Sequence, residues 1–233
     1  MGAPIRRPAE PPRAGSAIAG IERIERFDRA ERAVHWANAV LFAILLLTAA
    51  ALYLPPLMAV FGRRRLVEDV HLAAGLALPI PLLAGLASRR YRDDLRRFNR
   101  WDANDRKWMR LVVANRRARA AGRAELRDGK FNAGQKLNAA FTAGVIVVML
   151  VTGVIMYWFH PWPLTWRTGA TYTHDWLAAA IVVVVLGHIS YALRDPDALR
   201  SMWRGTIPRR WARLHARGWL EEVEELESGR GRP

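Results

Sequence analysis

Charged residues are absent from four long stretches of the chain. Residues 33–62, 70–88, 137–166 and 176–193 contain no Asp, Glu, Lys or Arg. A helix that crosses a bilayer needs about 20 mostly apolar residues, and each stretch is long enough or nearly so. A soluble helix would interleave charged and apolar positions instead. We therefore predict an all-α integral membrane protein, a four-helix transmembrane bundle with spans at about 34–58, 70–88, 137–159 and 172–193.

The overall composition hides this pattern. With 52% hydrophobic residues, 24% charged residues and a net charge of +15, the 233-residue chain resembles an ordinary basic soluble domain. These values average apolar spans with charged loops. The absence of cysteine is more informative, because it excludes disulfides, Cys-ligated zinc, iron–sulfur clusters and covalently attached haem. Any metal or redox chemistry must use His, Met or carboxylates.

Basic residues lie mainly on one side of the predicted membrane. Of the 36 Lys and Arg, 7 precede the first span, 16 lie between the second and third, and 9 follow the fourth. The other two connections hold 3 and 1. The side rich in Lys and Arg is cytoplasmic, so both termini and the loop 89–136 are expected to face the cytoplasm. We predict a multi-pass protein of the bacterial inner membrane, whose basic flanks contact anionic lipid rather than nucleic acid.

The remaining segments divide the chain into an arm, a bundle and an end. The Pro-rich residues 1–20 are expected to form a disordered arm, residues 21–227 the four-span domain, and residues 228–233 a flexible end. The first span begins too late and is too long to be a cleaved signal peptide. Residues 104–121 fit either a helix at the cytoplasmic membrane surface or a solvated basic loop. The tail 209–227 is predicted to be a helix whose charges oppose the helix dipole, so packing or a partner must order it.

Four of the six histidines lie within or at the ends of the predicted spans: His35, His71, His174 and His188. An ionisable residue inside a span is a functional candidate, although a single one can serve only as a hydrogen bond between helices. His174 and His188 are 14 residues apart, which places them about 21 Å apart along one helix and on similar faces. Chain direction puts His71 at the outer level with His174, and His35 at the inner level with His188.

Two histidines that face each other from different helices are the ligands that a six-coordinate b-type haem requires. The porphyrin also needs an apolar slot between helices. Small residues one turn beyond the ligands, at Ala39, Gly75 and Ala178, leave room for a flat ring. The sequence therefore predicts two haems b stacked across the membrane, which form a path for electrons. His160 and His215 are expected to be an interface residue and a solvated residue.

Two local motifs resemble a known family. The first span opens with Arg32-Ala33-Val34-His35-Trp36, and the third is preceded by Phe131-Asn132-Ala133-Gly134-Gln135-Lys136. The second motif resembles the Tyr-Asn-Ala-Gly-Gln-Lys segment of the cytochrome b (gamma) subunits of respiratory membrane-bound formate dehydrogenases, with Phe131 in place of Tyr. Residues 152–155 and 209–212 also fit this family. The resemblance covers roughly residues 23–226, and the long N-terminal arm departs from it.

The resemblance implies a redox relay. A separate catalytic (alpha) subunit with a molybdenum or tungsten pterin oxidises formate, and an iron–sulfur (beta) subunit passes the electrons to an outer haem on His71 and His174. They continue to an inner haem on His35 and His188 and then to a quinone, menaquinone or ubiquinone, at the cytoplasmic side. This chain alone does not oxidise formate. The resemblance implies that it is one part of a formate:quinone oxidoreductase.

The resemblance also implies positions for the quinone and the partner. The quinone is expected near Asn132, Ala133, Gly134 and Gln135, because amide groups donate hydrogen bonds to a quinone carbonyl and glycine allows close approach. Without the resemblance, this segment fits an ordinary cap before a helix. By topology, the outer loops 58–69 and 160–173 are expected to dock the iron–sulfur subunit.

Two other functions fit part of the sequence. A di-haem cytochrome b of a nickel–iron hydrogenase or a thiosulfate reductase has nearly the same haem geometry, and the motif at 132–136 favours formate dehydrogenase. A transporter or proton channel that uses the histidines as a relay predicts a colourless protein. It gives no reason for histidines at two matched levels.

Overall fold

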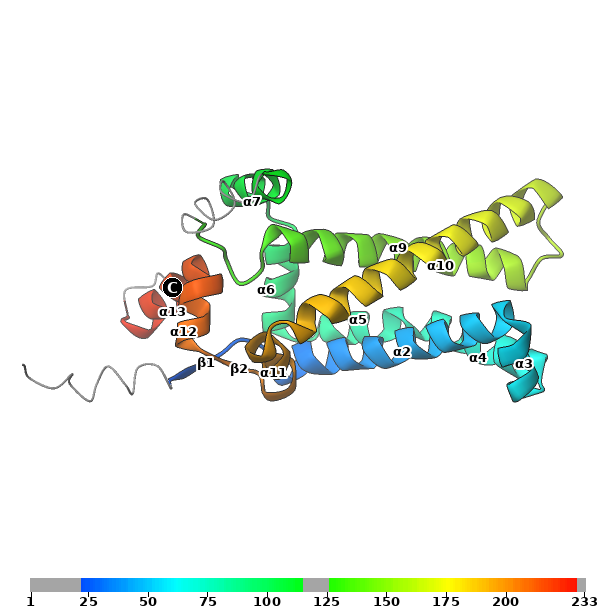
Figure 1. The fold of residues 1–233 in the computed structure, drawn as a ribbon, viewed down its shortest axis with the longest axis horizontal. Coiled ribbons are helices and arrows are strands. Elements are labelled where there is room, and N and C mark those ends of the chain that lie inside the picture. Colours follow the sequence, from blue (N-terminus) through cyan, green and yellow to red (C-terminus); the bar gives the residue numbers. More distant parts are fainter. Residues whose placement is uncertain (1–21, 115–125, 230–233) are drawn as a thin grey trace, which may run out of the picture.

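Four long helical segments form the centre of the molecule (Figure 1). The computed structural model describes residues 22–114 and 126–229, so the predicted arm and residues 230–233 lie outside the described residues. All four segments are long and apolar enough to cross a membrane, as predicted. They are α2 (Arg29–Tyr53), α4 (Arg64–Ala77) continued by α5 (Pro79–Gly85), α9 (Ala133–Tyr157) and α10 (Leu164–Leu193).

The two ends of the bundle differ. One end holds the short helix α3 (Pro55–Phe61) and the link between α9 and α10. The other carries the segments richest in Lys and Arg, and we call it the basic end. Its elements are β1 (Arg23–Glu25), α6 (Arg89–Phe98), α7 (Ala103–Val113), α11 (Pro196–Arg204), β2 (Thr206–Pro208), α12 (Arg209–His215) and α13 (Arg217–Glu227). Residues 104–113 are thus helical, and residues 115–121 lie outside the described chain.

Helices α2 and α9 begin several residues before the predicted spans, because each has a capping box. The Asp28 side chain accepts a hydrogen bond from the backbone of Glu31, whose side chain accepts one from the backbone of Asp28. Asn132 and Gln135 make the same reciprocal pair in front of α9. A capping box satisfies backbone N–H groups that the first helical turn leaves without partners. Both helices therefore extend through a polar turn before their apolar segments.

The second span consists of two helices. The break is at Leu78, followed by Pro79 and Pro81. Proline has no backbone N–H and its ring clashes with the preceding turn, so it interrupts or kinks a helix. The chain continues in the same direction as α5, and together α4 and α5 cover the length of a membrane span.

The C-terminal tail is also divided, in contrast to the single helix predicted over 209–227. Ala216 lies between α12 and α13 with φ −149° and ψ 51°, outside the helical region. The tail is ordered by packing within the chain, and its hydrophobic cluster joins both helices to the two strands. The cluster consists of Ile24, Ile207, Trp211, Ala212, Ala216, Trp219 and Leu220.

A two-stranded antiparallel sheet, which the sequence did not predict, joins the start of α2 to the end of α11. Ile24 in β1 is opposite Ile207 in β2. Nearby, the indole N–H of Trp36 donates to the carbonyl of Met202 at 3.0 Å, and the Trp36 and Trp203 rings lie 4.0 Å apart. These contacts hold the basic ends of α2 and α10 in a fixed relation, since α11 follows α10 directly.

We predict that Gly205→Ala destabilises this junction by about 1–3 kcal/mol. Gly205 has φ +80°, its carbonyl accepts the backbone N–H groups of Arg26 and Phe27, and a Cβ there would lie 2.5 Å from the Phe27 carbonyl oxygen. Gly144→Ala is the matched control, because outside the backbone of its own helix no atom of the described residues lies within 4 Å of its added Cβ. Thermal denaturation in detergent should give a lower midpoint for Gly205→Ala only. Equal midpoints for the two variants would contradict the prediction.

Candidate functional site

The structure brings the four span histidines together as two pairs. His35 of α2 and His188 of α10 have ring centroids 6.3 Å apart, with an angle of 51° between ring planes. His71 of α4 and His174 of α10 have centroids 6.4 Å apart and a 62° angle. These are the pairings expected from helix direction and spacing. The His35–His188 pair lies toward the basic end, and the His71–His174 pair lies toward the opposite end.

The ring separation in both pairs suits a metal between two imidazoles. Two metal–nitrogen bonds of about 2 Å each, with half a ring added at either end, span about 6 Å. Two imidazoles occupy two of six coordination positions, and the four nitrogens of a porphyrin supply the rest. Each pair therefore has the donor set and spacing of a six-coordinate haem.

A threonine hydroxyl fixes the orientation of His71. Thr48 Oγ1 of α2 lies 2.7 Å from His71 Nδ1, and the same hydroxyl bonds to the carbonyl of Ile44 at 2.7 Å. A hydroxyl has one proton, which it donates to the carbonyl, so its oxygen accepts from His71 Nδ1–H. The neutral ring then presents the unprotonated Nε2, which is the form that binds a metal.

His174 is held in the same way from another helix. Thr152 Oγ1 of α9 lies 2.9 Å from His174 Nδ1 and bonds to the carbonyl of Val148 at 2.8 Å. Both histidines of this pair therefore direct Nε2 away from their threonine partners. Sequence reasoning did not assign a role to either threonine. The available signal was a hydroxyl at the level of a histidine within a charge-free span.

Helix α10 supplies one histidine to each pair, but the rest of the protein buries few of its residues. It packs mainly against α9, and of its 30 residues only Ala170 and Ile181 are buried. Its histidines face α2 and α4, with which its direct contacts are few. Such an apolar helix needs lipid on one side and an apolar group on the other. A flat porphyrin between α10 and the two facing helices fits this arrangement.

Small residues lie beside the pairs, with unequal clearance. A Cβ on Gly153 would be 3.5 Å from His174 Cε1, so this glycine lies directly against the ligand ring. A Cβ on Gly75 would be 3.8 Å from a Leu45 methyl carbon. Both are ordinary contact distances. The role of Gly75 in leaving room for a ring therefore stays a prediction.

The candidate quinone residues form the first turn of α9 at the basic end. Asn132 Oδ1 accepts from Gln135 N, and Gln135 Oε1 accepts from Asn132 N, each at 3.0 Å. These capping bonds use the side-chain oxygens and leave the amide N–H groups as donors that the cap does not consume. Ala133 is fully buried. Gly134 packs beneath Trp108 of α7, because a Cβ there would lie 2.9 Å from the indole.

The other two histidines join neither pair. His160 stacks on Phe159 with centroids 4.2 Å apart, at the end of the bundle opposite the basic end. His215 stacks on Trp211 in the tail, at 4.9 Å. Both are aromatic packing partners in this structure.

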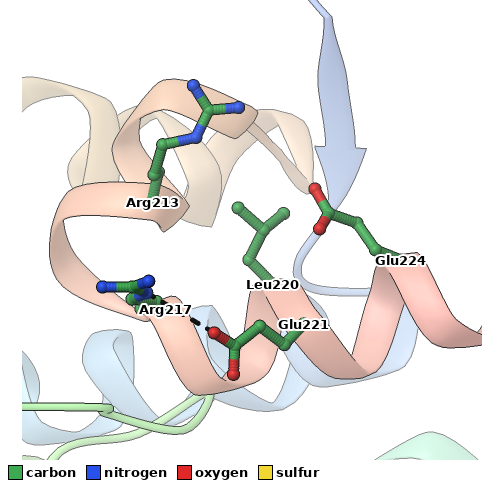
Figure 2. Close-up of a pocket in the computed structure, with 5 residues that line it drawn as sticks. All are labelled: Arg213, Arg217, Leu220, Glu221 and Glu224. Carbon is green, nitrogen blue, oxygen red and sulfur yellow. Dashed lines mark ion pairs between the residues drawn. The ribbon is translucent and has the colours of Figure 1, made fainter.

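A pocket of about 410 Å³ lies between α12 and α13, away from all four span histidines (Figure 2). Charges of both signs line it, and Arg217 pairs with Glu221 at 3.4 Å. Two arginines and two glutamates line the pocket, so its formal charges balance. Its lining residues are Arg213, Arg217, Leu220, Glu221 and Glu224.

Comparison with known proteins identifies the family. Residues 26–205 match the prokaryotic cytochrome b561 family. The chain belongs to this family. Membership of the cytochrome b561 family implies haem b binding and a membrane location, in agreement with the histidine pairs and the four apolar helices.

Similar proteins confirm the resemblance found in the motifs. The chain is 26% identical over 207 residues to the cytochrome b556(Fdn) subunit of nitrate-inducible formate dehydrogenase from Escherichia coli K12, a match that covers 85% of this chain and 90% of that subunit. It is 28% identical over 204 residues to the cytochrome b556(fdo) subunit of the same organism, covering 84% and 90%. The Haemophilus influenzae formate dehydrogenase cytochrome b556 subunit is 25% identical over 211 residues, covering 88% and 85%.

We predict that Thr48→Val weakens haem binding at the His71–His174 pair. Hydrogen-bond partners of metal-bound histidines typically contribute 10–100-fold to metal affinity, so haem retention should fall by about tenfold or more. The midpoint potential should rise, because an imidazole without its acceptor donates less charge to ferric iron. Haem content after gel filtration and a redox titration measure both effects.

Thr171→Val is the matched control. Its hydroxyl also bonds to a helix carbonyl, that of Arg167 at 3.0 Å, but the side chain is exposed. This variant should keep wild-type haem content and potentials. A Thr48→Val protein with wild-type potentials and retention would show that the hydroxyl does not act on the ligand.

Proposed function

We propose that this chain is the di-haem cytochrome b subunit of a membrane-bound formate dehydrogenase. The observation that carries the proposal is the presence of two histidine pairs, at 6.3 and 6.4 Å, at two levels of one apolar bundle. The formate dehydrogenase subunits to which the chain is similar support this choice over a hydrogenase or thiosulfate reductase partner. The chain itself contributes electron transfer and quinone reduction, and formate oxidation belongs to a partner.

The basic end is assigned to the cytoplasm. The described Lys and Arg that precede α2, connect α5 to α9 and follow α10 gather there, and such residues are enriched on the cytoplasmic side of membrane proteins. The His71–His174 pair is then the outer one, and the His35–His188 pair is the inner one. When bound, the two haems carry electrons from an outer iron–sulfur subunit to a quinone at the inner side. The exposed apolar faces of the spans contact lipid.

The iron–sulfur partner is assigned to the outer end, around α3 and the link between α9 and α10. Arg64 there pairs with Glu68 at 2.9 Å and Arg65 with Asp69 at 3.5 Å, on exposed turns of α4. The Tyr157 hydroxyl donates to Asp69 and so ties α9 to this surface. The pairs orient charged groups outward beside the His71–His174 pair. The partner in turn associates with the molybdenum or tungsten pterin subunit.

The quinone is assigned to the first turn of α9. Asn132 and Gln135 have their oxygens committed to the cap, so their amide N–H groups have a fixed orientation. Donors of this kind hold a quinone carbonyl, which accepts hydrogen bonds only. Ala133 and Gly134 are small residues, so they allow close approach to the backbone of this turn. Trp108 covers Gly134 on the α7 side.

The proposal predicts two b haems per chain. A pyridine haemochrome assay on the purified protein should give two, and His71→Ala or His35→Ala should each lower the count to one, because each removes one axial ligand. His160→Ala is the control and should keep both haems, since His160 lies outside both pairs. A folded but colourless wild-type protein would instead favour a histidine relay in a transporter.

We further predict that Asn132→Asp impairs quinone binding without loosening the fold. Aspartate caps a helix about as well as asparagine, but it lacks the amide donor. The KM for quinone should rise by about tenfold, as expected when one hydrogen bond is lost, with an unchanged haem spectrum and denaturation midpoint. An unchanged KM would remove Asn132 from the quinone site.

A further inference from the structure

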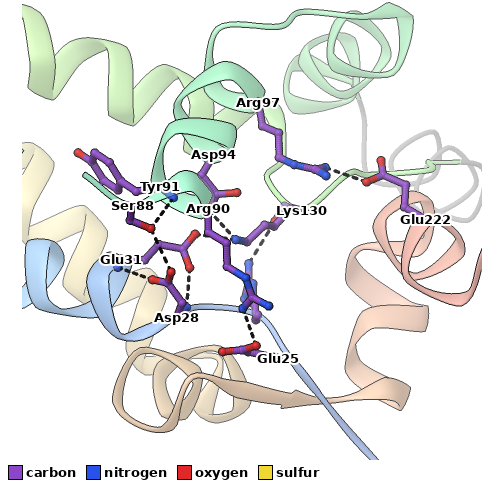
Figure 3. A network of polar contacts seen from close by, with 11 residues as sticks. Glu25, Asp28, Glu31, Ser88, Arg90, Tyr91, Asp94, Arg97, Lys130 and Glu222 are labelled. Carbon is purple, nitrogen blue, oxygen red and sulfur yellow. Dashed lines mark hydrogen bonds and ion pairs between the residues drawn. The ribbon is translucent and has the colours of Figure 1, made fainter. Parts of the chain in front are cut away.

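Two buried carboxylates share one buried lysine at the basic end (Figure 3). Lys130 Nζ lies 2.9 Å from Glu31 Oε1 and 2.5 Å from Asp94 Oδ2. The side chains of Glu31, Asp94 and Lys130 are only 6%, 8% and 9% exposed. They come from α2, from α6 and from the segment before α9. We call them the carboxylate cluster.

The charges of the carboxylate cluster do not balance if both acids are ionised. Burial, followed by the hydrogen bond with Glu31, raises the pKa of Asp94 from 3.8 to about 8. Asp94 therefore holds a proton at neutral pH, and the remaining charges are one lysine and one carboxylate. Among the described residues, Arg26 is a further charged group near Asp94, and burial lowers its pKa to about 10, so that it stays a cation.

The carboxylate cluster belongs to segments that lead to His35 and to the proposed quinone residues, and polar groups at the surface adjoin it. Glu31 is four residues before His35, about 6 Å along the α2 axis, and Lys130 is two residues before Asn132. On the other side, Asp28 accepts a hydrogen bond from Ser88 at 3.2 Å, and the exposed Arg90–Glu25 ion pair faces solvent. Figure 3 shows Asp28, Ser88, Arg90 and Glu25 near the cluster. The Phe27 and Phe131 rings also lie against Lys130.

We propose that the carboxylate cluster loads and passes the protons that quinone reduction consumes. This inference rests on the proposed function. Reduction of a quinone takes two electrons, supplied by the reduced cytochrome, and two protons, one for each carbonyl oxygen. We assign both protons to Asp94, which releases one, becomes a carboxylate beside Lys130, and takes up the next from water at the basic end. Asp94 carries each proton and Glu31 positions it, and because neither contacts the quinone, water passes the proton from Asp94 to the carbonyl oxygen.

A single ion pair does not account for two carboxylates on one lysine, although Glu31 also caps α2. Nearby, Lys136 and Asp105 tie α9 to α7 through one 2.6 Å ion pair, with side chains 9% and 3% exposed. One lysine and one carboxylate are thus enough to join two buried elements in this region. A second carboxylate that shares its lysine with another costs free energy when it ionises in a dry site. The presence of Asp94 beside Glu31 is explained if the Asp94 proton is transferred to the quinone.

The test compares Asp94→Asn with Asp93→Asn, which changes the neighbouring exposed carboxylate on α6, in the haem-loaded protein. The amide introduced by Asp94→Asn cannot carry the transferable proton but still donates a hydrogen bond to Glu31. Quinol formation by Asp94→Asn should be at least about tenfold slower, less than the 10²–10⁴-fold of a direct proton donor, because water offers a bypass. The wild-type rate should fall above about pH 8, where Asp94 loses its proton. This fall should be absent in Asp94→Asn. Asp93→Asn should keep both the rate and the pH profile, because Asp93 is exposed and pairs with Arg96 outside the cluster.

Two readouts do not depend on activity. Infrared difference spectra of the wild type should contain a protonated-carboxyl C=O band that titrates near pH 8 and is missing in Asp94→Asn. The folded protein binds more protons at Asp94 than the unfolded chain between pH 3.8 and about 8, so the wild type loses stability as pH rises through this range. The denaturation midpoint of the wild type should therefore fall relative to that of Asp94→Asn as pH rises.

The outcomes separate the inference from the proposed function. A wild type without haem or without quinone reduction overturns both. A wild type that reduces quinone, with an Asp94→Asn variant that keeps its rate and pH profile, overturns only the proton assignment. If Asp94→Asn fails to fold, the wild-type infrared titration decides alone, and the absence of a carboxyl band near pH 8 overturns the assignment.

Discussion

The structure depends on one requirement: α10 must present two histidines to two different helices, at two levels, without packing tightly against either. Each His–His distance must stay near 6 Å although the helices that carry the rings have few direct contacts. Side-chain interdigitation, which normally fixes helix positions, is therefore weak where position matters most. Other contacts have to set the relation between α10 and its neighbours.

The two levels solve this problem by different means. At the His71–His174 pair, hydroxyls of α2 and α9 hold the ring nitrogens directly, so the orientation is set inside the apolar region. At the His35–His188 pair, the alignment comes from outside the spans, through the β1–β2 strands and the contacts of Trp36 with α11. A polar sheet is tolerated there because water satisfies its free edges, whereas a membrane interior excludes open strand edges.

The sequence predicted what depends on local periodicity and missed what depends on distant partners. Charge-free stretches predict spans because lipid contact requires them, and the 14-residue spacing of His174 and His188 predicts their levels because helix geometry is fixed. The β1–β2 pairing joins residues more than 180 positions apart. The threonine contacts and the carboxylate cluster likewise join separate helices, and no periodicity encodes them. The break at Leu78 was readable from Pro79, but the tail division at Ala216 has no comparable signal.

Electrostatics at the basic end follow burial rather than net charge. With Arg26 and Lys130 beside it, Asp94 would have a lowered pKa if Coulomb attraction dominated. Its pKa is raised because desolvation is the largest contribution, and the nearby Glu31 carboxylate adds to it. Attraction to a cation does not offset the desolvation of a carboxylate when the carboxylate and the cation are both buried and a second anion competes for the same lysine. The surrounding positive charge therefore leaves one carboxyl protonated near neutral pH, next to the helix that presents His35.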